Sequence, residues 1–435
     1  MDMKRPLLIK NAIVVAQPDR AQPFLGWVRI RGTQIEAVGV GAPVEEAIGD
    51  EAEVIDARGG ILIPGLVNTH AHSHSSLTRG SAEGMTLEPW LNALIREQAQ
   101  LTPEQARVGA FATYAEMLLS GTTTALDMCI SPEVAREAAE AIGIRAVIAP
   151  YVADSMRFAP TLERTEAMLA STAPNARVRT WVGLHDIESV SEGLLRRGAS
   201  LARQYGVGLH LHCAESEFLT RKTLTRTGRS PVEELEHLDA LFPGTHLAHC
   251  VWVNESDQQR MAARGASAAH CPHANLKLGS GIAPVAAMRT AGVRVALATD
   301  GAKANNRLDM FDVMKFASLL AKGTARDASV LQAGEVLAMA STTGASVLGI
   351  DAGEIAPGRL ADLTLVGVDR FHLQPAVPET VVTNLVHAAR GSDVSLVIVD
   401  GRIVVREGRL TLVDQDQLLA RHAAVGRKLL ALGQA

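Results

Sequence analysis

The stretch Ile61-Leu62-Ile63-Pro64-Gly65-Leu66-Val67-Asn68-Thr69-His70-Ala71-His72 bears on the fold and the chemistry together. Its apolar part predicts a buried strand. The strand ends in His70 and His72, and side chains two apart on a strand point to the same side. Two imidazoles on one face can hold a metal ion. A short H-x-H motif also arises by chance from structural histidines, so the rest of the chain has to decide between the two interpretations.

The composition is that of a globular protein. The chain has 435 residues, of which 47% are hydrophobic and 20% charged, with a formal net charge of −5. This length predicts one large domain plus a smaller one. We find no apolar run of about 18 residues that would predict a membrane span, no convincing signal peptide, and no basic run typical of nucleic-acid binding. We therefore expect a cytoplasmic protein that binds neither membrane nor nucleic acid.

The four cysteines show no C-x-x-C pairing. They are Cys129, Cys213, Cys250 and Cys271. Their spacing predicts neither a disulfide framework nor a thiolate zinc site. Small packing residues are the favoured interpretation, because buried free cysteine is common.

The middle of the chain alternates strand-like and helix-like segments. The strand candidates lie near 61–70, 122–128, 144–151, 178–185, 207–213, 245–251, 266–271 and 293–299. Helical patterns lie between them, such as Pro103 to Ser120 and Pro132 to Ile142, the latter closed by Gly143. Eight strands alternating with helices predict a parallel closed barrel, which we place at residues 59–357.

Both ends of the chain are rich in short strands instead. Residues 1–58 and 358–413 carry turns and β-branched runs, with a strong hairpin signal at Asp400-Gly401. We expect these tails to pair into one composite β-sandwich domain. Residues 414–435 predict a terminal helix.

Polar residues with metal-binding side chains recur where the barrel strands end. They are His70, His72, His185, His210, His212, His249, His270 and Asp300. Active sites of parallel α/β barrels form at the C-terminal face. Scattered structural histidines would not all fall at this end of successive strands, so the pattern indicates a metal enzyme.

These motifs resemble the amidohydrolase superfamily, over nearly the whole chain. The matching text is P-G-L-V-N-T-H-A-H, L-T-R-G, H-x-x-E at 212–215, A-H-C-V at 248–251, N-L-K-L-G-S-G-I-A-P-V at 275–285, T-D-G at 299–301 and P-G-R-L-A-D-L at 357–363. The chain is most similar to the branch with S-adenosylhomocysteine/5-methylthioadenosine deaminases, guanine and cytosine deaminases, and triazine hydrolases. The resemblance implies a distorted (β/α)8 TIM barrel with a composite β domain.

The resemblance also implies a ligand set for one divalent metal ion. The ligands would be His70, His72, His212 and Asp300. Three imidazoles and a carboxylate suit zinc, and iron or manganese remain alternatives. The binuclear relatives bridge two ions with a carboxylated lysine on an early strand, and this chain has no lysine between Lys10 and Lys222. A mononuclear site is therefore expected.

The same resemblance implies catalytic roles for three side chains. Glu215 would carry a proton to the substrate nitrogen, and His249 would orient the attacking water, which the metal turns into hydroxide at neutral pH. Asp300 would receive that water's proton. His185 would stabilise the substrate ring.

Further residues are candidates for substrate contact. Trp90, Arg79 and His273 are assigned to the pocket, although Arg79 could equally be a structural ion-pair partner. His210 shares a face with His212 and is favoured as a core residue. The roles of His74 and His270 stay open.

The substrate is expected to be small. Nucleoside deaminases of this branch carry a ribose-binding glutamate after their W-L motif, and Ala99 falls at that position here. Their P-H-[AS]-P-Y segment is L-H-D-I-E in this chain, where only His185 is retained. We therefore expect deamination of an aminopurine, pterin, pyrimidine or s-triazine without a ribosyl group.

Two other functions stay open. At the same metal site an alkylamine or chloride could leave, or a cyclic amide or urea bond could be cleaved. A non-catalytic assembly protein is the third hypothesis, and the complete ligand set argues against it. A homodimer or larger homo-oligomer is expected from the resemblance.

Overall fold

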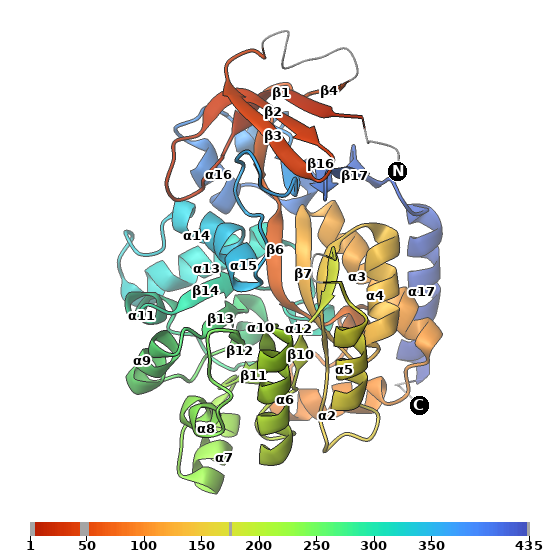
Figure 1. Cartoon of the computed structure of the whole chain (residues 1–435), viewed down its shortest axis with the longest axis vertical. Coiled ribbons are helices and arrows are strands. Elements are labelled where there is room, and N and C mark those ends of the chain that lie inside the picture. The colour runs from red at the N-terminus through yellow and green to blue at the C-terminus, as the bar shows by residue number, and fades with distance from the viewer. Residues whose placement is uncertain (1–4, 44–51, 174–175, 433–435) are drawn as a thin grey trace.

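The computed structural model describes residues 5–43, 52–173 and 176–432, and its centre is a set of parallel strands surrounded by helices (Figure 1). The central strands are β6 (Leu66–Ala71), β7 (Thr122–Cys129), β8 (Arg145–Pro150), β9 (Val178–Thr180), β10 (Val182–Gly183), β11 (Leu209–Cys213), β12 (Thr245–His249), β13 (Ser267–His270) and β14 (Arg294–Leu297). They form two parallel sheets, β6-β7-β8-β9 and β10-β11-β12-β13-β14. Since only Trp181 separates β9 from β10, these two make one interrupted strand. The eight predicted strand positions are therefore all occupied.

Side chains and backbone join the two sheets where β6 meets β14. Asn68 Nδ2 donates to Thr299 Oγ1 at 2.6 Å. The backbone N–H of Asp300 donates to the carbonyl of His70 at 3.0 Å. These bonds join β6 to β14 in place of the regular backbone hydrogen bonds that connect strands within each sheet. The predicted distorted (β/α)8 barrel is confirmed as the fold class, with its eight strands divided into two sheets.

Helices follow most barrel strands and cover the outside (Figure 1). The outer helices are α3 (Pro103–Leu119), α4 (Pro132–Ile142), α5 (Leu162–Ala170), α6 (Glu192–Tyr205), α8 (Pro231–His237), α9 (Glu255–Ala263), α11 (Val285–Thr290), α13 (Met310–Ala325), α14 (Ala333–Met339) and α15 (Thr342–Val347). Helix α3 begins with a capping box between Thr102 and Gln105. Helix α4 ends at Gly143 with φ of 92°, the left-handed conformation that glycine adopts without steric cost.

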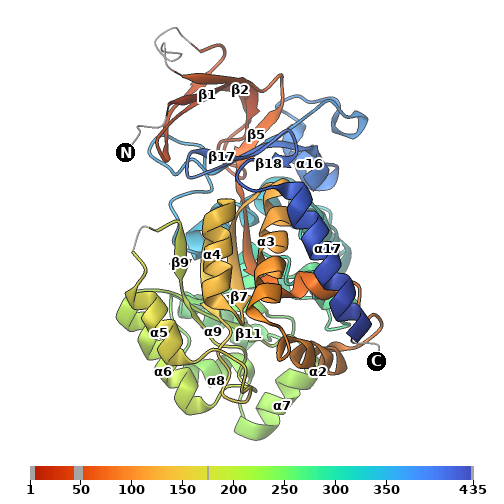
Figure 2. The ribbon, with the colours of Figure 1, turned by 90° about the vertical axis from the view of Figure 1, so that its right-hand side faces the viewer.

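Shorter elements lie over the C-terminal ends of the strands. They are η1 (Ser73–Thr78), α2 (Leu87–Gln98), α7 (Glu217–Thr227), α10 (Pro272–Lys277) and α12 (Ala302–Asn305). The C-terminal helix α17 (Gln415–Leu432) packs along α3 and η1 (Figure 2). None of the helices in the described ranges combines the length and apolar character needed to cross a membrane.

Strands from both chain ends join in one nine-stranded sheet. Its members are β1 (Leu7–Val14), β2 (Phe24–Arg31), β3 (Gln34–Val40), β4 (Glu53–Asp56), β5 (Ile61–Pro64), β15 (Leu363–Val366), β16 (Val394–Val399), β17 (Arg402–Arg406) and β18 (Arg409–Leu410). The two ends meet where β5 pairs antiparallel with β15. One face of the sheet encloses its own apolar core, and the other packs on the barrel. The short helix α16 (Val381–His387) lies beside this sheet (Figure 2).

The stretch at 61–70 differs from the single strand expected of it. It forms two strands, β5 in the composite sheet and β6 in the barrel, which separate at Gly65. A Cβ at Gly65 would lie 2.1 Å from Thr123 Oγ1, so the chain can turn there only without a side chain. The stretch at 61–70 therefore connects the composite sheet to the barrel.

A buried ion pair adds a second link between barrel and sheet. Arg145 on β8 donates from Nε to Asp362 Oδ2 at 2.6 Å and from Nη2 to Asp400 Oδ1 at 2.9 Å. The Asp362 side chain is 1% exposed. The carboxylates raise the pKa of Arg145 against the opposing effect of burial.

Candidate metal centre

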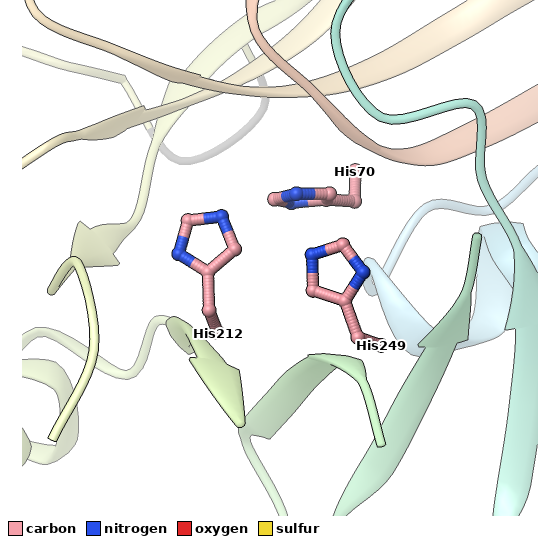
Figure 3. A group of neighbouring side chains, drawn as sticks. All are labelled: His70, His212 and His249. Atoms are coloured by element: carbon pink, nitrogen blue, oxygen red, sulfur yellow. The ribbon is translucent and has the colours of Figure 1, made fainter. Parts of the chain in front are cut away.

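Four potential ligands and His249 meet at the C-terminal face of the barrel. His70 lies at the end of β6 and His72 just beyond it, His212 lies on β11, His249 ends β12, and Asp300 follows β14. The ligand atoms of His70, His212 and His249 lie within 4.8 Å of one another, as do those of His70, His72 and Asp300. Figure 3 shows the three rings of the first group converging on one space. The strand ends thus bring together all four predicted ligands, with His249 beside them.

The hydrogen bonds of His72 and His212 fix which ring nitrogen faces the centre. His72 Nδ1 lies 2.7 Å from the carbonyl oxygen of Met128, and His212 Nδ1 lies 2.7 Å from that of His185. A carbonyl can only accept, so each ring carries its proton on Nδ1. Both Nε2 atoms therefore present lone pairs, and they face each other across 3.3 Å. Two facing lone pairs repel unless a cation lies beside them.

His70 is oriented by a second histidine. His210 Nδ1 lies 2.8 Å from the backbone oxygen of His246 and donates to it. Its Nε2 then accepts from His70 Nδ1 at 2.8 Å. The lone pair of His70 is left on Nε2, which is buried and has no hydrogen-bond partner among the described residues. Outer contacts of this kind set the tautomer of metal-binding histidines.

The electrostatics of the group favour ligation. Burial lowers the pKa of His70 and His212 well below the usual value, and lowers that of His72 to about 3. All three are therefore neutral near pH 7, the state in which imidazole binds metals. Asp300 Oδ1 lies 3.6 Å from His70 Nε2 and 3.4 Å from His72 Nε2. Three neutral imidazoles and one carboxylate fit a divalent transition metal such as zinc.

The backbone is strained at two of these residues. Asp300 has φ of 62° and His249 has φ of 74°, the left-handed region that residues other than glycine seldom adopt. Such conformations cost of order ~1 kcal/mol or more and cluster at functional sites. The strain here turns both side chains into the shared space.

Glu215 and His249 stand beside the potential ligands. His249 Nδ1 lies 2.9 Å from Asn275 Oδ1, and its Nε2 lies 3.8 Å from Glu215 Oε2. Burial, as the largest cause, raises the pKa of Glu215 to about 7. A carboxyl group with such a pKa can both give and take a proton near neutral pH.

A small cavity adjoins the metal centre. It is lined by His72, His212, His249 and Asp300 and by Leu87, Trp90, Leu91, Leu94, Gln98, Tyr151, His185, Asp186, Glu215 and Leu219. The cavity volume is about 30 Å³, so a heterocycle can enter only if lining side chains move aside.

His185 and Trp90 line the cavity as the sequence predicts. His185 Nδ1 lies 2.6 Å from Ser189 Oγ, and its ring packs against Tyr151 with 4.4 Å between centroids. Trp90 is buried, and its Nε1 has no partner among the described residues. Both rings can contact a substrate.

Arg79 and His273 do not belong to the cavity lining. Arg79 forms an ion pair with Glu116 and donates to the backbone oxygen of Asn306 at 2.9 Å. This is the structural alternative that the sequence left open for Arg79. The ring of His273 packs on Phe316, with 4.1 Å between centroids. Their assignment as substrate contacts stays a prediction without support from the geometry.

The structure also gives the surroundings of the remaining histidines and cysteines. His210 orients His70 and offers no ligand atom to the centre. His74 Nε2 lies 2.7 Å from Gln98 Nε2. His270 is buried, and burial lowers its pKa to about 3. All four cysteines are buried and free.

Three polar lining residues were not identified from the sequence: Tyr151, Asp186 and Gln98. Tyr151 directly follows β8 and Asp186 follows His185. Both positions carry the strand-end signal that identified the histidines. Gln98 ends helix α2, and its distance from any strand left it without such a signal.

Comparison with known proteins identifies the family. The model of the amidohydrolase family matches residues 61–404, and the chain belongs to this family. It is 38% identical to the 5'-deoxyadenosine deaminase of Methanothermobacter thermautotrophicus, over 88% of this chain and 90% of that protein. It is 35% identical to the 5-methylthioadenosine/S-adenosylhomocysteine deaminase of Syntrophobacter fumaroxidans, over 97% and 98%.

A solved structure extends this similarity to a zinc enzyme. An adenosine deaminase from Xanthomonas campestris with bound zinc superimposes with a TM-score of 0.91 at 28% identity, covering 98% of both chains. The predicted class, a metal-dependent hydrolase of C–N bonds that deaminates a nitrogen heterocycle, is confirmed at that level. The zinc bound in this neighbour and the cluster of potential ligand atoms in this chain support a divalent metal ion at the site.

Proposed function

We propose that this protein deaminates an aminopurine ring hydrolytically, with zinc as its metal. The observation that supports this proposal most is that His70, His72, His212 and Asp300 lie together beside a cavity lined by Glu215 and His249. Adenosine-type deaminases among the relatives support the aminopurine. The zinc in the adenosine deaminase structure supports the metal.

The chemistry divides between the metal and the side chains. When bound, the ion supplies the Lewis acidity that makes water nucleophilic at neutral pH. His249 donates from Nδ1 to Asn275, so its Nε2 can accept a hydrogen bond from the water and orient it, while Asp300 takes the proton that the water gives up. Protonated Glu215 donates to a ring nitrogen as the ring carbon is attacked. The amino group then leaves as ammonia with the proton from Asp300, and the proton of the new C–OH group returns to Glu215. Ring C–NH₂ plus water thus gives C=O plus ammonia.

The size of the substrate is a separate prediction. Ala99 is exposed, just beyond α2 and outside the cavity lining. The neighbouring carboxylate, Glu97, is engaged by the fully buried ammonium group of Lys303. Neither residue presents a free carboxylate to a ribose, which supports the expectation of a free base. The two named relatives are nucleoside deaminases, which favours the opposite outcome.

One panel of substrates tests both the proposed deamination of an aminopurine and the expectation of a small substrate. The purified zinc-loaded enzyme is assayed for ammonia release from adenine, guanine, 5'-deoxyadenosine and S-adenosylhomocysteine. Turnover of any aminopurine supports the proposed reaction, and no ammonia from the whole panel would refute it. Faster turnover of S-adenosylhomocysteine than of any free base would refute only the expectation of a small substrate.

We also propose that the enzyme works in the cytoplasm as a homodimer or larger homo-oligomer. The four free cysteines support a reducing compartment. Light scattering coupled to gel filtration measures the oligomeric state directly, and a mass of one chain would contradict the second part.

A further inference from the structure

One face of helix α2 forms part of the wall of the cavity beside the metal centre. Trp90, Leu94 and Gln98 follow one another at intervals of four residues, so they share a face of the helix. All three are buried and line the cavity. This face therefore provides a wall that a heterocycle bound in the cavity would contact.

The side-chain amide of Gln98 has a hydrogen-bond partner for its nitrogen but none for its oxygen among the described residues. Its Nε2 lies 2.7 Å from Nε2 of His74, to which it donates. Its Oε1 is buried and has no hydrogen-bond partner among the described residues. Buried polar atoms in native proteins nearly always have a partner, and leaving one unpaired costs about 1–3 kcal/mol. An acceptor that is fixed in place, buried and unpaired beside a reaction cavity is suited to a donor on the substrate.

We propose that Gln98, positioned by His74, recognises the substrate by accepting a hydrogen bond from an N–H or O–H group of the substrate. The inference rests on the proposed aminopurine deamination and specifies how that site selects its substrate. Two sources could provide the donor: the N9–H of a free purine base, or a hydroxyl of a ribosyl substituent at N9. Both are donors on the side of the ring remote from the amino group that leaves.

His74 acts in this proposal as a positioning residue. It lies in the turn η1, two residues after the potential ligand His72, and is 4% exposed. Accepting from the Gln98 amide keeps that side chain from rotating away from the cavity. Because His74 lies outside the cavity lining, its effect on turnover passes through Gln98.

The test compares substrates that differ by one donor. The wild-type enzyme and Gln98→Leu are assayed with adenine and 9-methyladenine, and with 5'-deoxyadenosine and its 2',3'-dideoxy counterpart. In the wild type, kcat/KM should be at least about tenfold higher for the member that carries the donor, in the pair that matches the true source. In Gln98→Leu this preference should fall to within about twofold.

Controls separate this effect from loss of the fold or of the metal. Gln100→Leu makes the same chemical change two residues away on an exposed side chain outside the cavity lining, and should keep the preference. Zinc content should be unchanged in both variants, since Gln98 contacts no potential ligand of the metal. If Gln98→Leu lowers kcat/KM equally for both members of each pair, or leaves the preference intact, the proposal is wrong. If the wild type releases no ammonia from any purine, the proposed function fails instead.

The role of His74 has its own readout. His74→Leu should weaken the preference like Gln98→Leu, mainly by raising KM for the substrate that carries the donor. His74→Gln should restore it, because an amide oxygen can accept from the Gln98 amide as the imidazole does. Equal loss in both His74 variants would show a role in folding alone and would overturn the positioning role.

Discussion

Replacing His210 should weaken zinc binding although His210 does not contact the metal. Its Nε2 accepts from His70 Nδ1 at 2.8 Å and its Nδ1 donates to the backbone of His246 at 2.8 Å. This chain of bonds leaves the lone pair of His70 on Nε2, which faces the centre. In His210→Leu the Nδ1–H of His70 loses its acceptor, and the proton is free to move to Nε2.

The magnitude follows from the burial of that group. His70 is 0% exposed, so no solvent replaces the lost acceptor. An unpaired buried donor costs about 1–3 kcal/mol, and each 1.4 kcal/mol is about a tenfold change in Kd. Zinc affinity should fall by about 5- to 150-fold, in line with the roughly 10- to 100-fold effect typical of such outer contacts.

Competition with a chelator of known zinc affinity measures this Kd directly. His210→Gln should recover much of the affinity, because the amide oxygen of glutamine can occupy the place of Nε2. His246→Leu is the matched control: it removes another fully buried barrel imidazole, whose Nδ1 bonds Ser267 Oγ at 2.9 Å and not a ligand. The reasoning would be refuted by unchanged zinc affinity in His210→Leu, or by an equal loss in His246→Leu.

Three further outcomes are expected. Glu215→Gln should keep one zinc per chain by elemental analysis while kcat falls by roughly 100-fold or more; loss of zinc would show that Glu215 is a ligand. Asp300→Ala should lose both zinc and turnover, and retained zinc would remove it from the ligand set. Arg145→Leu leaves the Asp362 carboxylate buried and unpaired, so urea unfolding should show a loss of about 3–5 kcal/mol; a loss below about 1 kcal/mol would mean that the pair does not stabilise the joint between barrel and sheet.

The convergence of the potential metal ligands could be predicted from the sequence because their positions follow from rules of topology, although the ligand set itself was implied by the family resemblance. Parallel strands place their C-terminal ends on one face, so His70, His212 and Asp300 must converge once their strands are located. The helices followed from local signals in the same way, since α4 runs from Pro132 to Ile142 and stops at Gly143 as predicted. These features depend on spacing along the chain, which the sequence contains.

The division of the stretch 61–70 into β5 and β6 at Gly65 depends on a contact with the neighbouring strand β7. Pro64 and Gly65 mark a break in the sequence, but an apolar run on both sides still reads as one strand. The close approach of Thr123 on β7, which leaves no room for a Cβ, decides where the two strands separate. Such an approach is a property of the packed structure and is not encoded in local periodicity.

The contacts around the potential metal ligands were even harder to predict from the sequence. His210 was favoured as a core residue because it lies one layer below His212, yet its Nε2 bonds His70, 140 residues earlier in the chain. His74 and Gln98 carry no signal in the sequence that would link them, and only the fold brings the Gln98 amide to the His74 imidazole beside the cavity. Topology thus determines which potential ligands meet at the barrel mouth, whereas side-chain packing determines which residues orient them and line the cavity. We therefore expect substrate choice in this protein to depend on pairs such as His74 and Gln98, which lie outside the set of potential metal ligands.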